Sequence, residues 1–187
     1  MPYFPVFVDL KGKEVVVVGG GKVAERKIEK LLPFEPRIKV ISPRITEGIR
    51  ELHNQGKIEI TLRKVRLSDI KGAFLVIVAV DDIKLQKRIY QYCKRRGILC
   101  NSVDSINYCS FVFPALVVKG DVVIGISTSG KVPALSRAIR EHIEKSLPQN
   151  IESIRQALEN VRKSLPKGKE RQEILTQMAL KLFGIKK

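Results

Sequence analysis

A run of β-branched residues that ends in three glycines constrains the fold of this chain more than any other feature. Residues 14–18 read Glu-Val-Val-Val-Val, and Gly19, Gly20 and Gly21 follow at once. Apolar residues then recur at helical spacing over residues 23–32. The segment from Gly19 to Ala24 fits the pattern G-x-G-x-x-A, which is typical of the first strand-to-helix turn of dinucleotide-binding α/β folds.

Each small residue of this turn is expected there for a different physical reason. Gly19 permits a tight turn, Gly21 lets the backbone approach a pyrophosphate without an intervening Cβ, and Ala24 permits close packing of helix on strand. The start of the helix offers free N–H groups and a positive dipole end. We therefore predict that Gly19, Gly20 and Gly21 bind a dinucleotide; the alternative is a glycine-rich turn without a ligand.

The remaining periodicity predicts an open, Rossmann-type parallel sheet. Apolar runs favour strands, and intervening segments with helical spacing favour crossover helices. The predicted strands are residues 14–18, 37–41, 58–62, 73–80 and 98–103, and the helices are residues 23–32, 45–55 and 83–96. Asp81 and Asp82 precede the last of these helices, and capping is expected for one of them.

The pattern changes after Val103. Residues 111–118 and 122–127 are predicted to form a hairpin around Gly120, followed by a helix at residues 134–147 and a basic helical tail from residue 151. We therefore expect three regions: a nucleotide-binding domain at residues 1–112, a small α+β region at 113–148, and a helical C-terminal region at 149–187.

The charge balance favours anionic partners. The chain has 35 lysines and arginines against 19 acidic residues, a formal net charge of +16. Such a field attracts nucleic acid, an acidic membrane surface or a polyanionic small molecule, and a solvated basic surface without a partner is the alternative.

No apolar run approaches the roughly 18 residues of a membrane span. The start of the chain has no secretory signal pattern, so we expect a cytoplasmic protein. Cys93, Cys100 and Cys109 fit no zinc spacing, so no metal site is expected.

The end of the second predicted strand leaves the choice of coenzyme open. An acidic residue is expected there to bind the ribose hydroxyls of NAD. This chain has Ser42-Pro43-Arg44 instead. Arg44 suits the 2′-phosphate of NADP, and it equally suits the pyrophosphate or ribose of NAD.

Two further groups are candidates for chemistry. Asp104 follows the fifth predicted strand, at the edge where open α/β sheets bind ligands, and apolar neighbours would raise its pKa toward that of a general base. A cap or turn aspartate is the alternative. A polar turn before the later helix can hold a carboxylate or phosphate, with ordinary turn chemistry as its alternative. Its residues are Ser127, Thr128, Ser129 and Gly130.

Together, several separated segments resemble the precorrin-2 dehydrogenase family, the N-terminal module of siroheme synthases, over about residues 3–148. The order and spacing of the segments carry the resemblance. They are Pro5-Val6-Phe7 with Leu10, residues 18–27, Ala79-Val80-Asp81-Asp82, Cys100-Asn101-Ser102-Val103-Asp104, residues 110–115 and residues 127–133.

The resemblance implies NAD-dependent oxidation of precorrin-2 to sirohydrochlorin in siroheme biosynthesis, with Asp104 as general base. It implies coenzyme contacts at Lys22, Val23, Pro43 and Arg44, beside the glycines, and it favours NAD. It also implies a homodimer formed through the region after the Rossmann domain. Some members insert Fe²⁺ into sirohydrochlorin and others only dehydrogenate, so ferrochelation stays open.

The resemblance also gives the basic charge a specific substrate. Precorrin-2 carries many acetate and propionate carboxylates, and arginine forks suit carboxylates. Arg137 and Arg140 are the candidates for binding them. The rival interpretation is an NAD(H)-binding, redox-sensing regulator that binds DNA. Against it, the sequence has no helix-turn-helix pattern, so we expect no nucleic-acid partner. We also expect no membrane partner.

Overall fold

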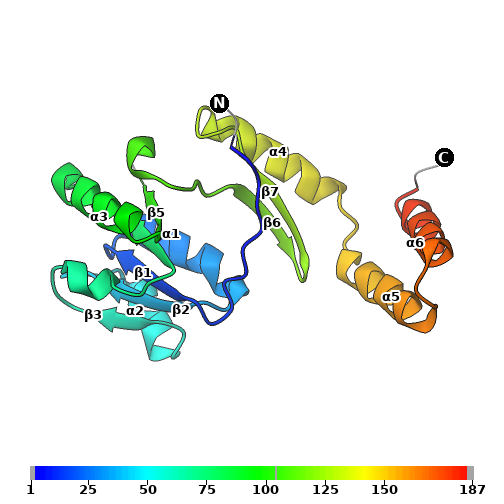
Figure 1. The fold of residues 1–187 in the computed structure, drawn as a ribbon, viewed down its shortest axis with the longest axis horizontal. Coiled ribbons are helices and arrows are strands. Elements are labelled where there is room, and N and C mark those ends of the chain that lie inside the picture. The colour runs from blue at the N-terminus through cyan, green and yellow to red at the C-terminus, as the bar shows by residue number, and fades with distance from the viewer. Residues whose placement is uncertain (1–2, 104, 185–187) are drawn as a thin grey trace. The chain divides into compact units, whose positions relative to one another are not determined.

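The computed structural model describes residues 3–103 and 105–184, and the chain divides into two compact units (Figure 1). The first unit comprises Phe4–Phe113. The second comprises the described residues from Pro114 onward together with Tyr3.

A parallel five-stranded sheet forms the centre of the first unit. Its strands are β1 (Glu14–Val18), β2 (Arg37–Ile41), β3 (Glu59–Thr61), β4 (Leu75–Val78) and β5 (Leu99–Ser102). They lie in the order β3-β2-β1-β4-β5 with in-register parallel pairing throughout. The strand order reverses beside β1, between its neighbours β2 and β4, which is the switch point at which such sheets bind ligands.

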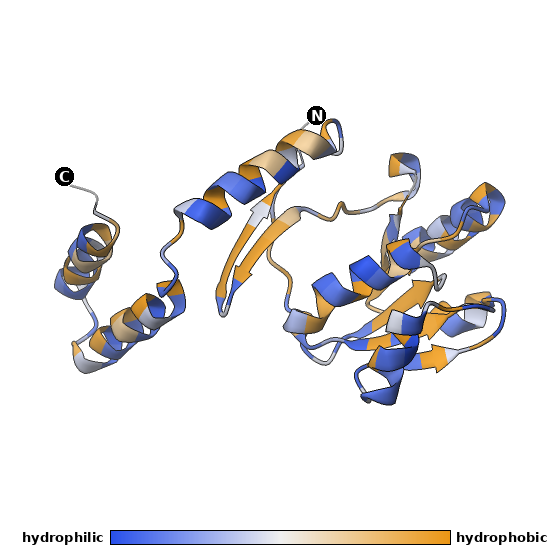
Figure 2. Cartoon of the chain, turned by 180° about the vertical axis from the view of Figure 1, so that it is seen from behind, coloured by the Kyte–Doolittle hydropathy of each residue, from blue (hydrophilic) through white to orange (hydrophobic). Residues whose placement is uncertain are grey.

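Helices cover both faces of this sheet because its central strands are apolar on both sides. They are α1 (Lys22–Leu31), α2 (Glu47–Asn54) and α3 (Ile83–Arg95), with 3-10 turns η1 (Leu32–Phe34), η2 (Leu67–Ile70) and η3 (Ile106–Tyr108). Val15 and Val17 of β1 pack with α1 and α2, and Val16 and Val18 pack with α3. Much of the sheet is accordingly coloured hydrophobic in Figure 2, and residues 15–18 of β1 and Leu75–Val78 of β4 are apolar throughout.

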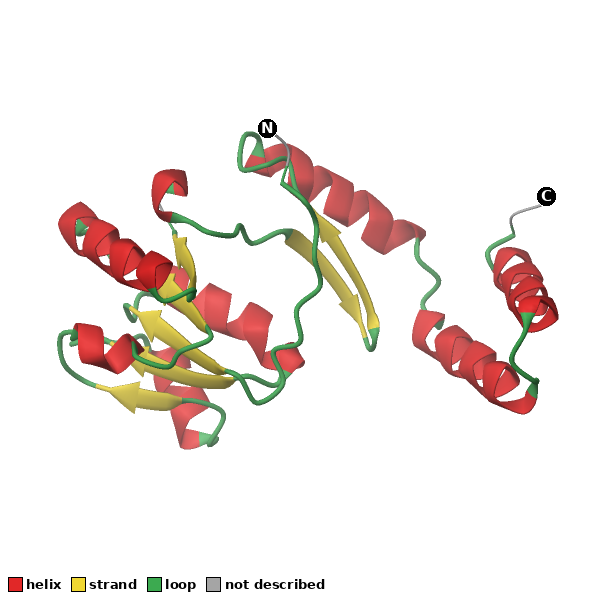
Figure 3. Ribbon diagram, in the orientation of Figure 1, coloured by secondary structure: helices red, strands yellow, loops and turns green. Residues whose placement is uncertain are grey.

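The second unit contains a hairpin and three helices (Figure 3). Strands β6 (Ala115–Lys119) and β7 (Val122–Ile126) pair antiparallel, and α4 (Pro133–Ser146) packs against β6. Helices α5 (Ile151–Ser164) and α6 (Lys169–Leu182) pack on each other. Arg155 of α5 contacts Asp121 of the hairpin turn, with 3.1 Å between Nη2 and Oδ2. In the described part of the chain, no helix has the length and apolar character to cross a bilayer.

These observations confirm the predicted fold class, an α/β Rossmann-type sheet followed by a small α+β region and a helical tail. Asp82 caps α3, since its Oδ1 accepts a hydrogen bond from the Leu85 N–H at 3.0 Å. One predicted strand was too long: residues 111–114 are not part of the hairpin, which begins at Ala115. Phe111 and Phe113 pack against the core of the sheet instead, and Pro114 lacks the N–H that a strand ladder uses.

Candidate coenzyme site

Gly19 is wedged between the carboxyl ends of two strands. Its N–H donates to the Ile41 carbonyl of β2 at 3.0 Å, and its φ of +113° lies in the region that favours glycine. A Cβ on Gly19 would lie 2.1 Å from the Ala79 carbonyl oxygen, just beyond β4. No side chain fits at this position, so Gly19 sets the path of the turn.

Gly20 joins the turn to the loop after β2. Its carbonyl accepts a hydrogen bond from the Thr46 N–H at 2.9 Å, and a Cβ would lie 2.3 Å from the Arg44 carbonyl oxygen. The loop of residues 42–46 is therefore held directly beside the glycine turn. The Ser42 hydroxyl donates to the Arg44 carbonyl at 2.6 Å, which closes the same loop.

Gly21 is the open glycine of the three. It is the N-cap of α1 with φ −84° and ψ −177°, no side chain caps the helix, and a Cβ there would meet nothing within 4 Å. The first N–H groups of a helix have no intrahelical acceptor, so they face this open space with the positive end of the helix dipole. The turn fits an anionic diphosphate, which would take the space that a side chain at Gly21 would fill.

The other coenzyme candidates surround this opening. Lys22 and Val23 begin α1 and are exposed, and Pro43 and Arg44 are exposed in the neighbouring loop. The Lys22 ammonium lies 3.1 Å from Glu25 Oε1. The fold thus brings the glycines, Lys22, Val23, Pro43 and Arg44 together at the switch point.

The chain doubles back beside β5 after the strand ends, and this return segment, residues 109–113, was missed by sequence reasoning. The Ser110 N–H donates to the Cys100 carbonyl and the Cys100 N–H to Ser110 Oγ, both at 2.8 Å. Asn101 Nδ2 donates to the Phe111 carbonyl at 3.0 Å. These contacts join residues that are ten positions apart in the sequence, and no local sequence pattern predicts them. Asp104 lies outside the described residues.

Lys27 of α1 lies against this return segment. Its ammonium nitrogen is 4.0 Å from the centroid of the Phe113 ring. Burial, and then the neighbouring Lys30 charge, lower the pKa of Lys27 to about 8. Burial raises the pKa of the Cys109 thiol, which accepts a hydrogen bond from the Ser102 N–H at 3.3 Å. The sequence did not predict that Lys27, a charged residue on a helix, is partly buried.

The second unit holds the candidates for binding substrate carboxylates. Thr128 Oγ1 lies 3.0 Å from both the Val132 carbonyl and Ser136 Oγ, and the Ser129 N–H donates to Ser127 Oγ at 3.0 Å. Ser129 and Gly130 have positive φ and complete the turn. The hydroxyls of Ser127 and Thr128 therefore stabilise the turn itself.

The two candidate arginines lie on α4 and form ion pairs within that helix. Arg137 Nε lies 3.0 Å from Glu141 Oε1, and Arg140 contacts both Glu141 and Glu144. A carboxylate ligand would compete with these intrahelical partners for the guanidinium groups.

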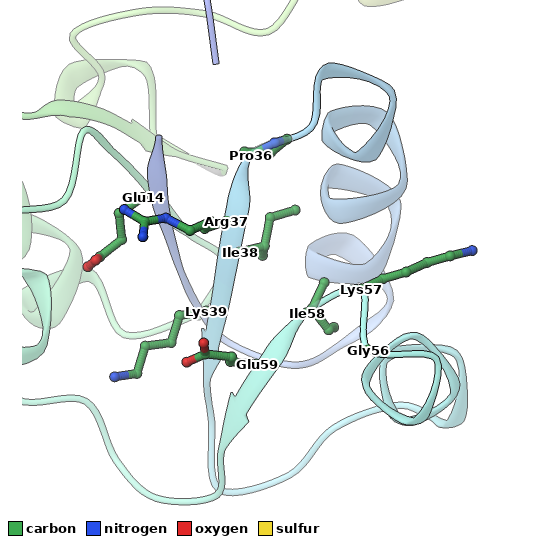
Figure 4. A pocket seen from close by; sticks show the side chains of 9 residues that line it. All are labelled: Glu14, Pro36, Arg37, Ile38, Lys39, Gly56, Lys57, Ile58 and Glu59. Carbon is green, nitrogen blue, oxygen red and sulfur yellow. The ribbon is translucent and has the colours of Figure 1, made fainter. Parts of the chain in front are cut away.

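A separate hollow of about 390 Å³ lies at the opposite edge of the sheet, around the amino ends of β1, β2 and β3 (Figure 4). Arg37, Lys39 and Glu59 point to one side of the sheet there, and Ile38 and Ile58 point to the other. This hollow is distant from the switch point along the strands and contains none of the predicted site residues. Among residues 3–103 and 105–184, no group of three or more histidine, cysteine or acidic side chains is placed to hold a metal ion.

The strand order, the switch point and the open glycine turn define a nucleotide-binding domain of the Rossmann class. Residues 6–115 match the family model described as "Putative NAD(P)-binding", and the chain belongs to this NAD(P)-binding family.

The chain is also similar in sequence to siroheme synthases. The siroheme synthase of Photorhabdus laumondii is 38% identical over 151 residues, which are 81% of this chain and 32% of that protein. The siroheme synthase of Nitrosococcus oceani is 35% identical over 149 residues, 80% of this chain and 32% of that protein. This chain thus spans about a third of the length of these relatives.

One solved structure is similar over almost its whole length. It is described as SirC, precorrin-2 dehydrogenase, and is 28% identical with a TM-score of 0.76. The match covers 94% of this chain and 89% of that one.

Proposed function

We propose that this chain is an NAD-dependent precorrin-2 dehydrogenase, which oxidises precorrin-2 to sirohydrochlorin in siroheme biosynthesis. The observation that carries the proposal is the likeness to SirC over nearly the full length of both chains. The open glycine turn supports it independently, because a dehydrogenase of this kind needs a site for the coenzyme diphosphate.

Bound NAD⁺ supplies the hydride acceptor. The N–H groups at the start of α1 would bind its diphosphate at Gly21, and Gly19 and Gly20 hold the turn in place. Lys22, Val23, Pro43 and Arg44 are exposed beside this turn and would contact the nucleotide.

Asp104 is the proposed general base. It follows β5 in the sequence, and β5 ends with Ser102 at the carboxyl edge of the sheet. Bound NAD⁺ would accept a hydride from precorrin-2 and the Asp104 carboxylate would accept a proton, which together account for the two electrons and two hydrogens removed.

The proposed dimerisation region is residues 113–148, which lies in the second unit except for Phe113, and the proposed helical C-terminal region begins at residue 149. On α4 and just before it, Val132, Leu135 and Ile139 are 49%, 50% and 37% exposed, and their spacing of three and four residues forms an apolar stripe. Such a stripe suits contact with a second copy of the chain. Light scattering of the purified protein tests for the homodimer.

The same unit provides the proposed contacts to the polyanionic substrate. They are Ser127, Thr128, Ser129, Gly130, Arg137 and Arg140. Arg137 and Arg140 exchange their intrahelical glutamates for substrate carboxylates in this proposal. The protein acts in the cytoplasm on a small molecule, without a nucleic-acid or membrane partner.

An anaerobic assay with precorrin-2 and either NAD⁺ or NADP⁺ tests the proposal. We expect sirohydrochlorin to form with NAD⁺, and Asp104→Ala to lower turnover by about 10²-fold or more. The NAD⁺ dissociation constant of Asp104→Ala should stay unchanged. Absence of turnover in the wild type would contradict the proposed reaction, and near-normal turnover of Asp104→Ala would exclude this residue as the base.

A second anaerobic assay tests for ferrochelation. Sirohydrochlorin mixed with Fe²⁺ under anaerobic conditions, with and without the protein, reveals any accelerated insertion of the metal. Metal insertion at the rate of the protein-free control would limit the protein to dehydrogenation.

A further inference from the structure

The Glu25 carboxylate lies between the first turns of α1 and α2, and its side chain is only 12% exposed. A hydrogen bond from the Thr46 hydroxyl and the nearby Lys22 ammonium hold the pKa of Glu25 below its usual range. A Cβ on Gly48 would lie 2.5 Å from Glu25 Oε1. The carboxylate therefore packs directly against the start of α2.

This location adjoins the part of a Rossmann site that distinguishes the two nicotinamide coenzymes. The adenosine ribose lies near the end of β2, where an acidic side chain selects NAD and a basic one accommodates the 2′-phosphate of NADP. In this chain the end of β2 leads through residues 42–46 directly into α2, and Thr46 caps that helix. An acidic residue is absent from residues 42–46.

In residues 42–46, the polar side chains that could bind a 2′-phosphate already have hydrogen-bond partners within the protein, except for Arg44. The Ser42 hydroxyl donates to the Arg44 carbonyl and is buried. The Thr46 hydroxyl accepts from the Ile49 N–H and also serves Glu25. The positive end of α2 faces the Glu25 carboxylate. Arg44, which is exposed, remains as the cation that would favour NADP.

We propose that Glu25 makes the coenzyme site select NAD over NADP, because its carboxylate occupies the anion-favouring start of α2 and repels a 2′-phosphate. Glu25 thus provides from α1 the negative charge that other Rossmann domains place at the end of β2. This inference rests on the coenzyme assignment of the proposed function. It concerns the ratio of the affinities for NAD⁺ and NADP⁺, whereas the proposed function concerns whether the coenzyme site exists.

Equilibrium binding of NAD⁺ and NADP⁺ to the full chain tests this role without the tetrapyrrole. The wild type should bind NAD⁺ more tightly. Glu25→Gln keeps the shape of the side chain and removes its charge, so the ratio of the NADP⁺ to the NAD⁺ dissociation constant should fall about tenfold.

Glu47→Gln is the matched control. Glu47 stands in the first turn of α2, carries the same charge, and is 74% exposed in an ion pair with Arg50. Its substitution should change the ratio by less than about twofold, since exposed charges are screened. An equal change in both variants, or an unchanged ratio in Glu25→Gln, would overturn the role of Glu25.

Gly48→Ala tests the position of the charge rather than its presence. The added methyl group would displace the Glu25 carboxylate from the start of α2 while leaving it ionised. The dissociation-constant ratio should fall here too, though less than in Glu25→Gln, and an unchanged ratio would contradict the placement. If the wild type binds neither nucleotide, the coenzyme assignment itself fails; if it binds NAD⁺ and no variant changes the ratio, only the role of Glu25 fails.

Discussion

Gly19 and Gly21 are identical residues with opposite surroundings. Gly19 has a positive φ and no room for a Cβ, whereas Gly21 has an ordinary φ and open space around it. Backbone geometry explains the first glycine, and the approach of a ligand explains the second.

Alanine at these two positions should therefore separate stability from binding. Gly19→Ala should lower the free energy of unfolding by about 2 kcal/mol or more, because it adds both strain and a clash with the Ala79 carbonyl. Gly21→Ala should leave stability within about 0.5 kcal/mol and weaken NAD⁺ binding about tenfold or more. Urea unfolding and equilibrium binding measure the two effects; a stable Gly21→Ala variant with normal affinity would contradict the site.

Lys27 makes stability depend on alkaline pH. Its pKa is about 8 in the folded protein, lowered mainly by burial, and near 10.5 when unfolded. Between these values the unfolded chain binds more protons, so stability should rise as pH increases from about 8 to about 10.5. Lys27→Met should raise the free energy of unfolding at pH 7 by about 1 kcal/mol, after allowing for the lost contact with Phe113.

This gain should shrink as the pH approaches 10.5, because the wild-type amine is then neutral as well. Lys30→Met, on the exposed side of the same helix, is the control and should show no such trend. A constant difference between Lys27→Met and wild type across this pH range would argue against burial of the charge.

At the scale of elements, the connection from β3 to β4 is held by one carboxylate. Asp69 in η2 accepts two hydrogen bonds from the Arg63 guanidinium, each at 2.7 Å, and one from the Arg66 N–H. These contacts, led by Arg63, lower the pKa of Asp69 to about 2. Ile70, at the end of η2, is buried in the α3-side core, so the pair positions part of that core.

Asp69→Asn should therefore destabilise the protein by about 1–2 kcal/mol at neutral pH. Because the folded pKa is below the unfolded value of 3.8, the contribution of Asp69 is complete above about pH 4 and is lost as pH falls toward 2. Urea titrations at pH 7 and pH 2.5 should show a clear difference between variant and wild type that narrows at the acidic pH. A difference that persists undiminished would point to packing instead of charge.

The secondary structure of the first unit followed from local pattern. Residues 37–41 were predicted as a strand and form β2, and the other strand and helix ranges differ from the prediction by a few residues at their ends. Apolar periodicity is a property of neighbouring residues, so it survives in a single sequence. The exception is the start of the strand predicted at residues 111–118: Phe111 and Phe113 pack against the sheet core, and Lys27 of α1 contacts the Phe113 ring, which are contacts that are not local in the sequence.

At the scale of the whole molecule, some basic side chains form ion pairs with acidic ones and others do not. Arg137, Arg140 and Arg155 in the second unit form ion pairs with glutamates. In contrast, within the described residues, the basic side chains of α3 form no ion pair within 4 Å. They are Lys84, Lys87, Arg88, Lys94 and Arg95. The start of α3 follows β4, so part of this charge lies at the carboxyl edge where ligands bind.

This distribution predicts steering of a polyanionic substrate. Raising the ionic strength from about 0.02 M to 0.5 M should raise the KM for precorrin-2 several-fold at nearly constant kcat. The double variant Lys84→Gln/Lys87→Gln should show a weaker salt dependence than the wild type. Lys163→Gln/Lys169→Gln is a control, because both lysines are paired with glutamates in the second unit. A KM that does not respond to salt would exclude steering.

The sequence alone determined the class of fold and the place of the nucleotide turn. Both depend on patterns that neighbouring residues carry: the spacing of apolar side chains and three glycines between a strand and a helix. Only the tertiary structure decided that residues 109–113 return along β5 and that Lys27 and Glu25 are partly buried charges. Those properties arise from contacts between residues that are distant in the sequence, and no local sequence pattern encodes such contacts.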